Sequence, residues 1–508
     1  MTAWALRARD LKHYPHFDQV LKLAEANSLV TDPVRVAQNS FFPLLRYSKT
    51  WQPFRHKPEK SGKPRPKAKE RPIRYAARRD AYIFAYYRHL LSLHYEAELT
   101  RLGIGGCPIA YRRIPTPSDA RRGKCNIHFA REAFDRVREL GDCCVAAVDI
   151  SSYFESIDHE RLKALWCRLL GVEKLPADHF AVFKNVTSYR FVEREELYTR
   201  LGFYGKKTTT KSGKPIMGYL VPFEDVPTQL CSPQDFRQKV LGENGLYPSL
   251  VQKNPHSYGI PQGAPISDLL ANLYLLDFDV EMNNLAVGFG GTYLRYSDDI
   301  LLILPVSAPD AVAIMESLPA RIMQHGDKLL IKPEKSSLVQ YRVQGDRQAA
   351  ELLAGKQGKH GLEYLGFRYD GESVYLRDST VSSLYRKVAC AARGYADSTV
   401  KRYPGKGYTE LCGMFNFEEF MKKFGRVEDF EPTSAKNKWT FWTYVSRSTS
   451  EFGPRGKTIT AQVRRLRRVA KHRVKMELPF ALERRVKSGK APSTGGSLAS
   501  SPELPNLT

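Results

Sequence analysis

The sequence has no long apolar run and few cysteines for its length. None of its hydrophobic stretches approaches the roughly 20 residues that a membrane-spanning helix needs, and residues 1–10 lack the apolar core of a signal peptide. The eight cysteines show no Cys-x-x-Cys spacing, which argues against a zinc site or a disulfide framework. We therefore expect a cytoplasmic protein that does not contact a membrane and whose thiols are reduced and mostly buried.

Acidic residues are also scarce relative to basic ones. The chain has 79 lysines and arginines against 54 aspartates and glutamates, a formal net charge of +25. Such a surplus favours a polyanionic partner, with nucleic acid as the first candidate and an anionic membrane surface as the rival. The hydrophobic share of 42% is ordinary for a globular protein and excludes wholesale disorder. The 508 residues leave room for about two to four domains.

Residues 290–304 predict a hairpin with two acidic residues at its tip. Strand formers and an unbroken apolar run flank the turn formers Ser297, Asp298 and Asp299. Adjacent carboxylates beside a buried strand repel each other unless a cation joins them, and a hard divalent metal suits their oxygen atoms. Taken alone, such a pair is more often a solvated surface turn.

A second buried strand, predicted over 143–150, ends in another carboxylate, Asp149. Its continuous apolar run is typical of the central strand of a sheet. Asp158, a little further on, opens an amphipathic helix, and we interpret it as a helix cap. Two-metal phosphoryl transfer requires carboxylates from separate strands that converge on one spot. Asp149, Asp298 and Asp299 are therefore the candidate metal ligands.

Basic, proline-rich residues precede the first predicted long helix, 80–99. Prolines in the stretch 55–74 forbid a helix there, and its first half is either a solvated linker or a nucleic-acid contact. Its second half runs into an apolar segment. We therefore expect Arg74 and Arg78 to be held in place, as arginines that recognise phosphate are.

Two central segments are rich in turn formers. Residues 187–258 are predicted to be an irregular excursion that includes a basic, glycine-rich loop at 202–214. Residues 259–267 bend at their glycines and prolines and then begin a long helix, predicted over 268–286.

The C-terminal part predicts a hairpin followed by basic helices. Residues 362–369 and 373–376 are predicted strands joined by an Asp-Gly turn. From about 379 the pattern is helical, polar and basic, and after 487 the composition predicts disorder. The basic stretch is either a solvated helical face or, together with Arg112, a nucleic-acid contact made by Arg464, Arg465, Arg467, Arg468 and Lys471.

Five blocks resemble those of reverse transcriptases and occur in that family's order over roughly 71–370. Residues 149–154 resemble the first catalytic block and 296–299 the second. Residues 259–275 resemble the template- and nucleotide-binding block, as in group II intron maturases. Residues 333–336 are similar to the lysine-bearing block and 364–367 to the primer grip. One such block matches easily by chance, whereas the ordered set is specific.

The resemblance implies an α+β fold of the right-hand polymerase type. Residues 1–140 would form an N-terminal extension and fingers, and 141–375 a palm whose antiparallel sheet carries the catalytic aspartates. Residues 376–486 would form a helical thumb with a basic extension, and 487–508 a disordered tail.

The family's roles can be carried over residue by residue. Asp149, Asp298 and the backbone of Ile150 would bind two magnesium ions, or manganese in their place, with Asp299 in support. Phe154 would be the steric gate that excludes a 2′-hydroxyl.

Other roles concern the nucleotide and the primer. Gln262 and Gly263 would contact the incoming nucleotide and the template, and Arg74 and Arg78 its triphosphate. Lys335 would protonate the pyrophosphate, unless it is a solvated turn lysine. The primer grip would comprise Leu365, Gly366 and Phe367.

Three stretches, 71–76, 109–112 and 123–127, resemble the bacterial defence-associated, or unknown-group, reverse transcriptases. Such relatives work with a partner non-coding RNA against phage, and some form oligomers. The resemblance thus implies an RNA-directed DNA polymerase that copies an RNA template with dNTPs into a DNA product. The alternatives are a retron or intron-type reverse transcriptase and a catalytically idle RNA-binding scaffold.

Overall fold

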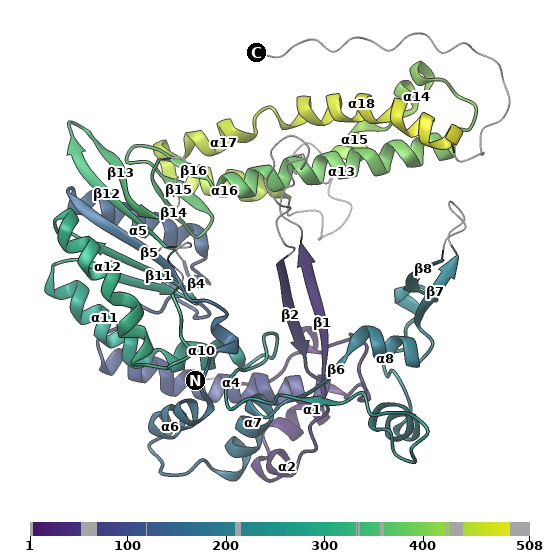
Figure 1. Cartoon of the computed structure of the whole chain (residues 1–508), viewed down its shortest axis with the longest axis horizontal. Coiled ribbons are helices and arrows are strands. Elements are labelled where there is room, and N and C mark those ends of the chain that lie inside the picture. The colour runs from purple at the N-terminus through teal and green to yellow at the C-terminus, as the bar shows by residue number, and fades with distance from the viewer. Residues whose placement is uncertain are drawn as a thin grey trace. The chain divides into compact units, whose positions relative to one another are not determined.

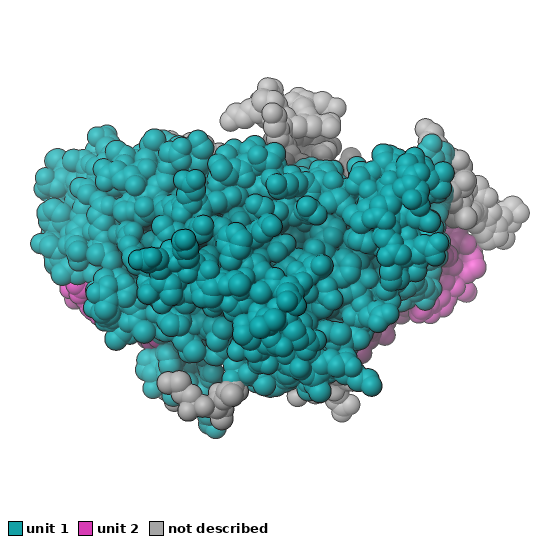
Figure 2. Space-filling model, turned by 90° about the horizontal axis from the view of Figure 1, so that it is seen from below, with its two compact units in different colours: residues 1–123, 140–341, 351–358 teal, residues 124–139, 342–350, 359–508 magenta. Residues whose placement is uncertain are grey.

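The computed structural model describes residues 4–51, 69–117, 119–208, 215–331, 333, 336–355, 360–422, 424–425 and 440–487. It mixes helices and sheets, as the α+β prediction requires (Figure 1). The chain divides into two compact units (Figure 2). Unit 1 comprises residues 1–123, 140–341 and 351–358, and unit 2 comprises 124–139, 342–350 and 359–508. None of the helices in the described residues is long and apolar enough to cross a membrane.

A five-stranded sheet, in the order β10-β11-β5-β12-β13, carries the predicted acidic residues. The central strand β5 pairs antiparallel with both β11 and β12, which confirms an antiparallel sheet here. Its apolar side chains are almost all buried, because the sheet is covered by helices. The strands are β5 Cys143–Asp149, β10 Thr292–Tyr296, β11 Asp299–Leu304, β12 Ser337–Gln344 and β13 Arg347–Gly355.

Helices of unit 1 pack against this sheet and against one another. Helix α11 contacts β10 and β11, and α12 contacts β5 (Figure 1). The helix predicted over 268–286 is broken at Leu275, whose φ of −99° and ψ of 15° lie outside the helical region. The cap prediction for Asp158 is confirmed, since its Oδ1 accepts a 2.8 Å hydrogen bond from the Arg161 amide. These helices are α4 Arg78–Arg101, α6 His159–Leu170, α10 Ser267–Tyr274, α11 Leu276–Gly288 and α12 Ala308–Met323.

A second sheet of unit 1, in the order β2-β1-β6-β9, lies beside shorter helices. Strand β1 pairs antiparallel with β2 and parallel with β6. The elements are α1 Leu23–Val30, α2 Pro33–Ala37, β1 Leu44–Trp51, β2 Lys69–Tyr75, α7 Ala177–Thr187, β6 Arg190–Glu193 and β9 Gln252–Lys253. The small strands β3 Pro115–Thr116 and β4 Asp119–Gly123 pair with each other.

The prediction that 187–258 is irregular is wrong. Besides β6 and β9, this region contains α8 Arg194–Arg200, β7 Tyr204–Thr208, β8 Pro215–Tyr219 and a π-helical turn at Phe236–Leu241. Some of its apolar residues, such as Val192, Leu197 and Val240, are fully buried in a small separate core with Leu45. Tertiary packing fixes elements that are too short to show a clear period in the sequence.

Unit 2 contains a three-stranded sheet, β14-β15-β16, rather than the predicted hairpin. The stretch 362–369 is not one strand, because Leu365 and Gly366 form a turn with φ values of 45° and 92°. The Asp-Gly turn predicted after Tyr369 does join the next two strands. The strands are β14 Leu362–Tyr364, β15 Phe367–Tyr369 and β16 Val374–Leu376.

Two long helices of unit 2, α13 and α18, lie side by side (Figure 1). They run in the same direction, because Tyr385 donates to the Gln462 carbonyl while Arg484 pairs with Asp397 further along. Buried residues recur every four positions or nearly so on both: Leu384, Val388, Ala392, Ala396 and Val400 face Leu466, Ala470, Val474, Leu478 and Ala481. The helices are α5 Asn126–Leu140, α13 Asp378–Arg402, α14 Tyr408–Met414, α15 Phe417–Met421, α16 Phe441–Phe452, α17 Lys457–Val463 and α18 Leu466–Lys487.

Candidate active site

The three predicted acidic residues lie together at one edge of the five-stranded sheet, by which we mean the side where β5 ends and β11 begins. Asp149 and Asp299 are direct register partners on β5 and β11. Asp298 occupies the turn between β10 and β11, and its carbonyl accepts a 3.1 Å hydrogen bond from the Ile150 amide. Directly opposed residues of antiparallel strands have Cβ atoms about 4.5–5.5 Å apart. Carboxylates from two distant parts of the chain therefore meet at this edge.

The donor set at this edge suits a hard cation. Asp299 is exposed, whereas Asp149 and Asp298 are half-buried, and all three offer the carboxylate oxygens that Mg²⁺ and Mn²⁺ prefer. Within the described part of the chain, no three His, Cys, Asp or Glu side chains are already arranged around one point. Opposed carboxylates repel, and a bound cation would offset this repulsion.

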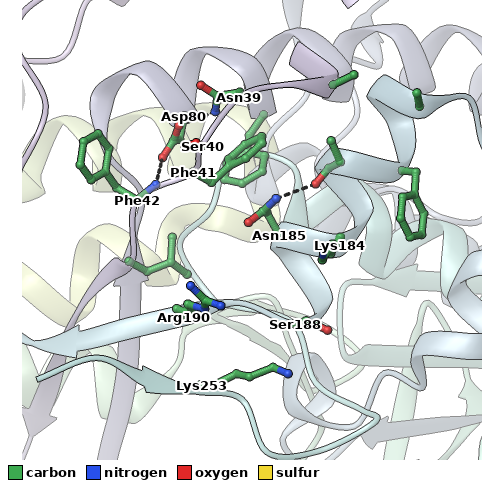
Figure 3. Close-up of a pocket in the computed structure, with 16 residues that line it drawn as sticks. Asn39, Ser40, Phe41, Phe42, Asp80, Lys184, Asn185, Ser188, Arg190 and Lys253 are labelled. Carbon is green, nitrogen blue, oxygen red and sulfur yellow. Dashed lines mark hydrogen bonds between the residues drawn. The ribbon is translucent and has the colours of Figure 1, made fainter. Parts of the chain in front are cut away.

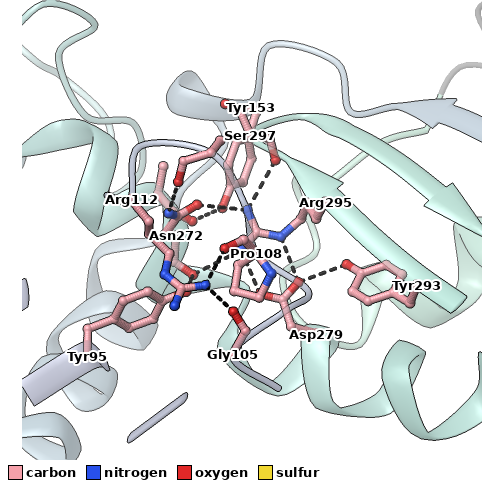
Figure 4. Close-up of polar contacts among 12 residues, drawn as sticks. Tyr95, Gly105, Pro108, Arg112, Tyr153, Asn272, Asp279, Tyr293, Arg295 and Ser297 are labelled. Carbon is pink, nitrogen blue, oxygen red and sulfur yellow. Dashed lines mark hydrogen bonds and ion pairs between the residues drawn. The ribbon is translucent and has the colours of Figure 1, made fainter. Parts of the chain in front are cut away.

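A buried network lies beneath the acidic turn (Figure 4). Arg295, on β10, makes a two-pronged contact with Asp279 of α11 through Nε and Nη2, at 2.7 and 2.6 Å. Its Nη1 donates to the Ser297 carbonyl at 3.1 Å and to Asn272 Oδ1 at 3.2 Å. Tyr293 donates to Asp279 at 2.8 Å. The guanidinium thus connects helices α10 and α11 to the residue that precedes Asp298.

Electrostatics reinforce this network. Both Arg295 and Asp279 have no exposed surface. Although burial by itself acts to lower it, the Asp279 carboxylate raises the pKa of Arg295 well above its usual value. Arg295 therefore stays charged, and its hydrogen bonds keep the turn in one position. Neither residue was predicted to belong to the site, although an arginine between Leu294 and Tyr296 of a buried strand is a usable signal.

The turn itself has an unusual backbone and a further support. Ser297 adopts a φ of 63°, a left-handed conformation that costs energy for a residue with a side chain. Its hydroxyl accepts a 2.9 Å hydrogen bond from Tyr111, which itself has a φ of 63°. Asn272 donates to the Ala110 carbonyl at 2.8 Å. The segment before Tyr111 thereby helps to hold the turn.

The predicted nucleotide-binding turn lies beside the segment that follows Asp149. The Ile260 amide donates to the Phe154 carbonyl at 2.8 Å, and the Arg74 amide donates to the Gln262 carbonyl at 2.9 Å. Gly263 has a φ of 123°, and a Cβ there would lie 2.7 Å from the Arg74 carbonyl oxygen. Only glycine permits this close approach. Phe154, Gln262, Gly263 and Arg74 therefore belong to one region of unit 1.

Arg74 is anchored, as the sequence predicts. Its side chain is only 9% exposed and lies 3.4 Å from Glu155. The guanidinium carbon lies 5.3 Å from the centre of the Tyr189 ring and 5.6 Å from that of Phe191. Aromatic faces attract such a cation and fix its position. Because Glu155 is half-exposed, the pair is reachable from solvent.

The prediction that Arg78 contacts a triphosphate is wrong. Its side chain is fully buried, forms an ion pair with Asp18 at 3.3 Å and donates to the carbonyls of Tyr14 and Thr228 at 3.0 and 2.8 Å. All of these partners are internal, so Arg78 joins the N-terminal segment to helix α4.

The prediction that Arg112 binds nucleic acid is wrong for the same reason. Its side chain is 8% exposed and pairs with Glu96 at 2.6 Å. It also donates to the carbonyls of Gly105 and Pro108 at 2.6 and 2.7 Å. The sequence shows only that a basic residue lies in a loop. It does not show that nearby backbone carbonyls accept hydrogen bonds from its guanidinium.

The predicted primer-grip residues lie in unit 2. Leu365 and Gly366 form the β14–β15 turn, where the Leu365 carbonyl accepts a 3.1 Å hydrogen bond from Asn126. The same amide group contacts the Tyr444 hydroxyl at 3.1 Å. Phe367 is buried, and its ring lies 6.0 Å from that of Tyr444. These contacts give the turn a defined shape within its own unit.

The predicted basic cluster is exposed, whereas Lys335 lies outside the described residues. Arg467 alone of the cluster is paired among the described residues, with Glu418, and its guanidinium lies 5.4 Å from the Phe417 ring centre. The other cations present their charge to solvent at the junction of α17 and α18: Arg464, Arg465, Arg468 and Lys471.

Comparisons with known proteins give structural neighbours only. No protein-family model and no curated protein matches the chain. The solved structures that resemble it include apo telomerase from Candida tropicalis, truncated from its C-terminal domain, with a TM-score of 0.36, 10% identity and coverage of 70% of this chain and 61% of that one. Telomerase from Candida albicans in complex with a fragment of telomeric RNA has a TM-score of 0.36 and 12% identity, and the match covers 89% of this chain and 64% of that one. The chain thus spans about six-tenths of the length of these two telomerases.

Proposed function

We propose that this chain is an RNA-directed DNA polymerase that copies an RNA template with dNTPs. The observation that carries the proposal is the pairing of Asp149 with Asp299 across β5 and β11, with Asp298 in the adjoining turn. Three carboxylates thus lie at one sheet edge, and their order along the chain is that of the reverse-transcriptase blocks, which supports the proposal. The phosphoryl-transfer chemistry needs such a set.

Each residue has a defined part in the proposed reaction. The carboxylates of Asp149 and Asp298, with the Ile150 backbone, would hold two magnesium ions or manganese, and Asp299 would support them. When bound, such ions stabilise charge on the attacking and leaving oxygens. The primer 3′-hydroxyl gives its proton to solvent water and its oxygen bonds to the α-phosphorus of the dNTP; the bond from the α-phosphorus to the oxygen that bridges it to the β-phosphate breaks, and pyrophosphate leaves with that oxygen.

The other residues of this region bind and select the nucleotide. Arg74, fixed on Tyr189 and Glu155, would place positive charge near the triphosphate. Phe154 would leave no room for a 2′-hydroxyl. Gly263 lets the nucleotide-binding turn approach strand β2 closely. Thus the proposed selectivity is for deoxynucleotides.

The proposed template is a dedicated non-coding RNA, and the proposed setting is antiphage defence in the bacterial cytoplasm. The likeness of residues 71–76, 109–112 and 123–127 to defence-associated reverse transcriptases supports this branch. The exposed cations at the α17–α18 junction supply a surface for RNA phosphates. Sequencing the nucleic acid that copurifies with the protein distinguishes this template from a retron or intron RNA, and mass measurement in solution tests for a homo-oligomer.

The experiment that tests the function is primer extension on an RNA template with magnesium and dNTPs. We expect the double variant Asp298→Ala/Asp299→Ala to lose DNA synthesis by at least about a hundredfold while RNA binding persists. The matched control removes two adjacent exposed carboxylates of α8, Glu195→Ala/Glu196→Ala. Undiminished synthesis in the first variant would contradict the assignment. A wild-type protein that binds RNA without synthesis would support the idle-scaffold alternative.

A further inference from the structure

Unit 1 contains a cavity of about 650 Å³ that none of the roles proposed above uses. It is lined by the segment 37–44 and by parts of α4, α7, β6 and β9 (Figure 3). It shares no lining residue with the candidate active site. Its volume is typical of pockets that hold small ligands, which range from about 300 to 1,000 Å³.

One wall of the cavity is a face of helix α7. Phe180, Lys184 and Ser188 recur every four residues and line the cavity, whereas Val182 and Val186 are fully buried on another face. Helical periodicity separates the two sets. The cavity-facing set combines an aromatic ring, a cation and a hydroxyl, a composition suited to a ligand with both apolar and anionic parts.

The opposite wall is held in place by Asp80. Its two carboxylate oxygens accept hydrogen bonds from the Asn39 side chain at 3.0 Å and from the Phe42 amide at 2.8 Å. The Phe41 ring stacks on Phe84 with centres 5.5 Å apart. Figure 3 shows Asn39 and Asp80 on the side of the cavity away from Arg190. This wall keeps its shape through contacts within the protein, so the cavity is preformed.

The third side carries two unpaired cations in an unfavourable arrangement. Arg190 and Lys253 are direct register partners on the antiparallel strands β6 and β9. Both are exposed and line the cavity, and neither pairs with a carboxylate in the part of the chain that the structure describes. Like charges directly opposite each other destabilise a sheet. A bound anion would turn this repulsion into attraction, and Lys184 adds a third charge from α7.

We infer that this cavity binds a nucleotide, with its phosphate on Arg190 and Lys253 and its base on Phe180. The Phe180 ring is 43% exposed; Lys163 Nζ lies over one face, 5.6 Å from the ring centre, so a base would stack on the other face. Asn185 uses its amide hydrogen on the Ala181 carbonyl, which leaves its oxygen to accept from a base amino group. A free nucleotide and the 5′-terminal nucleotide of an RNA strand carry the same chemistry. This inference does not depend on polymerase activity.

The first test measures binding of adenosine monophosphate and of adenosine to the full chain by calorimetry, with EDTA present so that no metal contributes. We expect the variant Arg190→Ala/Lys253→Ala to bind the monophosphate at least about tenfold more weakly, with little change for adenosine. The control Lys12→Ala/Lys174→Ala removes two exposed cations outside the cavity. Circular dichroism confirms that both variants are folded.

The second test distinguishes the two sources of the nucleotide. Octa-adenylate RNA with a 5′-phosphate is compared with the same strand carrying a 5′-hydroxyl, so that binding elsewhere on the basic surface cancels. Preference for the 5′-phosphate that disappears in Arg190→Ala/Lys253→Ala supports a strand terminus, and monophosphate binding without that preference supports a free nucleotide. Phe180→Ala should weaken the binding of adenosine monophosphate but not the binding of inorganic phosphate. If Arg190→Ala/Lys253→Ala and the control Lys12→Ala/Lys174→Ala bind adenosine monophosphate and the 5′-phosphorylated RNA equally well, the inference is overturned. It is also overturned if the wild type binds neither of these two probes.

Discussion

Arg295 and Asp279 form an ion pair in which neither side chain has any exposed surface, with 2.6 Å between Nη2 and Oδ2. The same guanidinium reaches the Ser297 carbonyl, one residue before Asp298. The position of the candidate catalytic turn thus depends on a charge pair that lies beneath the sheet edge. Any change that removes one partner leaves the other charge buried and unpaired.

The first prediction concerns the stability of this pair. We expect Arg295→Ala to lower the free energy of unfolding by about 3–5 kcal/mol, because Asp279 would remain buried without a counter-ion. The double variant Arg295→Met/Asp279→Leu should be less destabilised, since neither charge is left behind. Urea denaturation of both proteins measures the difference. A single variant more stable than the double variant would contradict this account.

The second prediction concerns the sugar specificity that we assign to Phe154. Replacing the ring with alanine should admit ribonucleotides, since the space beside the nucleotide sugar would no longer be filled. Primer extension with dNTPs and rNTPs gives the ratio of incorporation rates for Phe154→Ala and wild type. Phe289→Ala, which removes an aromatic ring that is 48% exposed elsewhere, serves as the control. An unchanged ratio in Phe154→Ala would remove the basis for a steric gate at this position.

The third prediction tests the close contact at Gly263. A Cβ added there would lie 2.7 Å from the Arg74 carbonyl oxygen, and the φ of 123° disfavours any side chain. We expect Gly263→Ala to lower thermal stability and DNA synthesis together, because strand β2 and the turn must separate. Gly288→Ala is the matched control, since nothing lies within 4 Å of its added Cβ. Similar behaviour of the two variants would show that the contact is not needed.

The fourth prediction concerns pH. Burial raises the pKa of Asp80 to about 7, although its hydrogen bonds with Asn39 and Phe42 act in the opposite direction. The folded protein keeps this proton at a pH where the unfolded chain, with a pKa near 3.8, has lost it. The stability that Asp80 contributes should therefore be largest below about pH 4 and fall by roughly 4 kcal/mol as the pH rises to about 7.

The variant Asp80→Asn isolates this contribution, because an amide does not titrate. Free energies of unfolding in urea at pH 5 and pH 8 should differ less in Asp80→Asn than in the wild type. Glu173→Gln, at an exposed position, provides the control. Equal pH dependence in Asp80→Asn and wild type would show that the Asp80 carboxyl does not drive the change.

The acidic residues of the site were predictable because their signals are local. Residues 143–148 and 300–304 are continuous apolar runs; Asp149 directly follows the first run, and Asp298 and Asp299 directly precede the second. A sheet brings such ends together. By contrast, the internal roles of Arg78 and Arg112 could not be read from the sequence, since they depend on carbonyls of distant or irregular segments.

The fold of the central region was missed for a related reason. In β6, Arg190–Glu193, only Phe191 and Val192 are buried. Two apolar residues give no period to detect. The pairing of Arg190 with Lys253 was equally hidden, because it joins strands far apart in the chain. Local patterns therefore located the acidic cluster but not the cavity.

The parallel packing of α13 and α18 has a consequence for biosynthesis. The residues of α13 that face its partner, from Leu384 to Val400, have left the ribosome before Leu466 to Ala481 have been translated. During that interval the apolar stripe of α13 has no α18 to cover it, and exposed stripes of this kind bind chaperones or aggregate. A chain truncated within this interval would leave the apolar face of α13 uncovered, so the packing of unit 2 depends on α18.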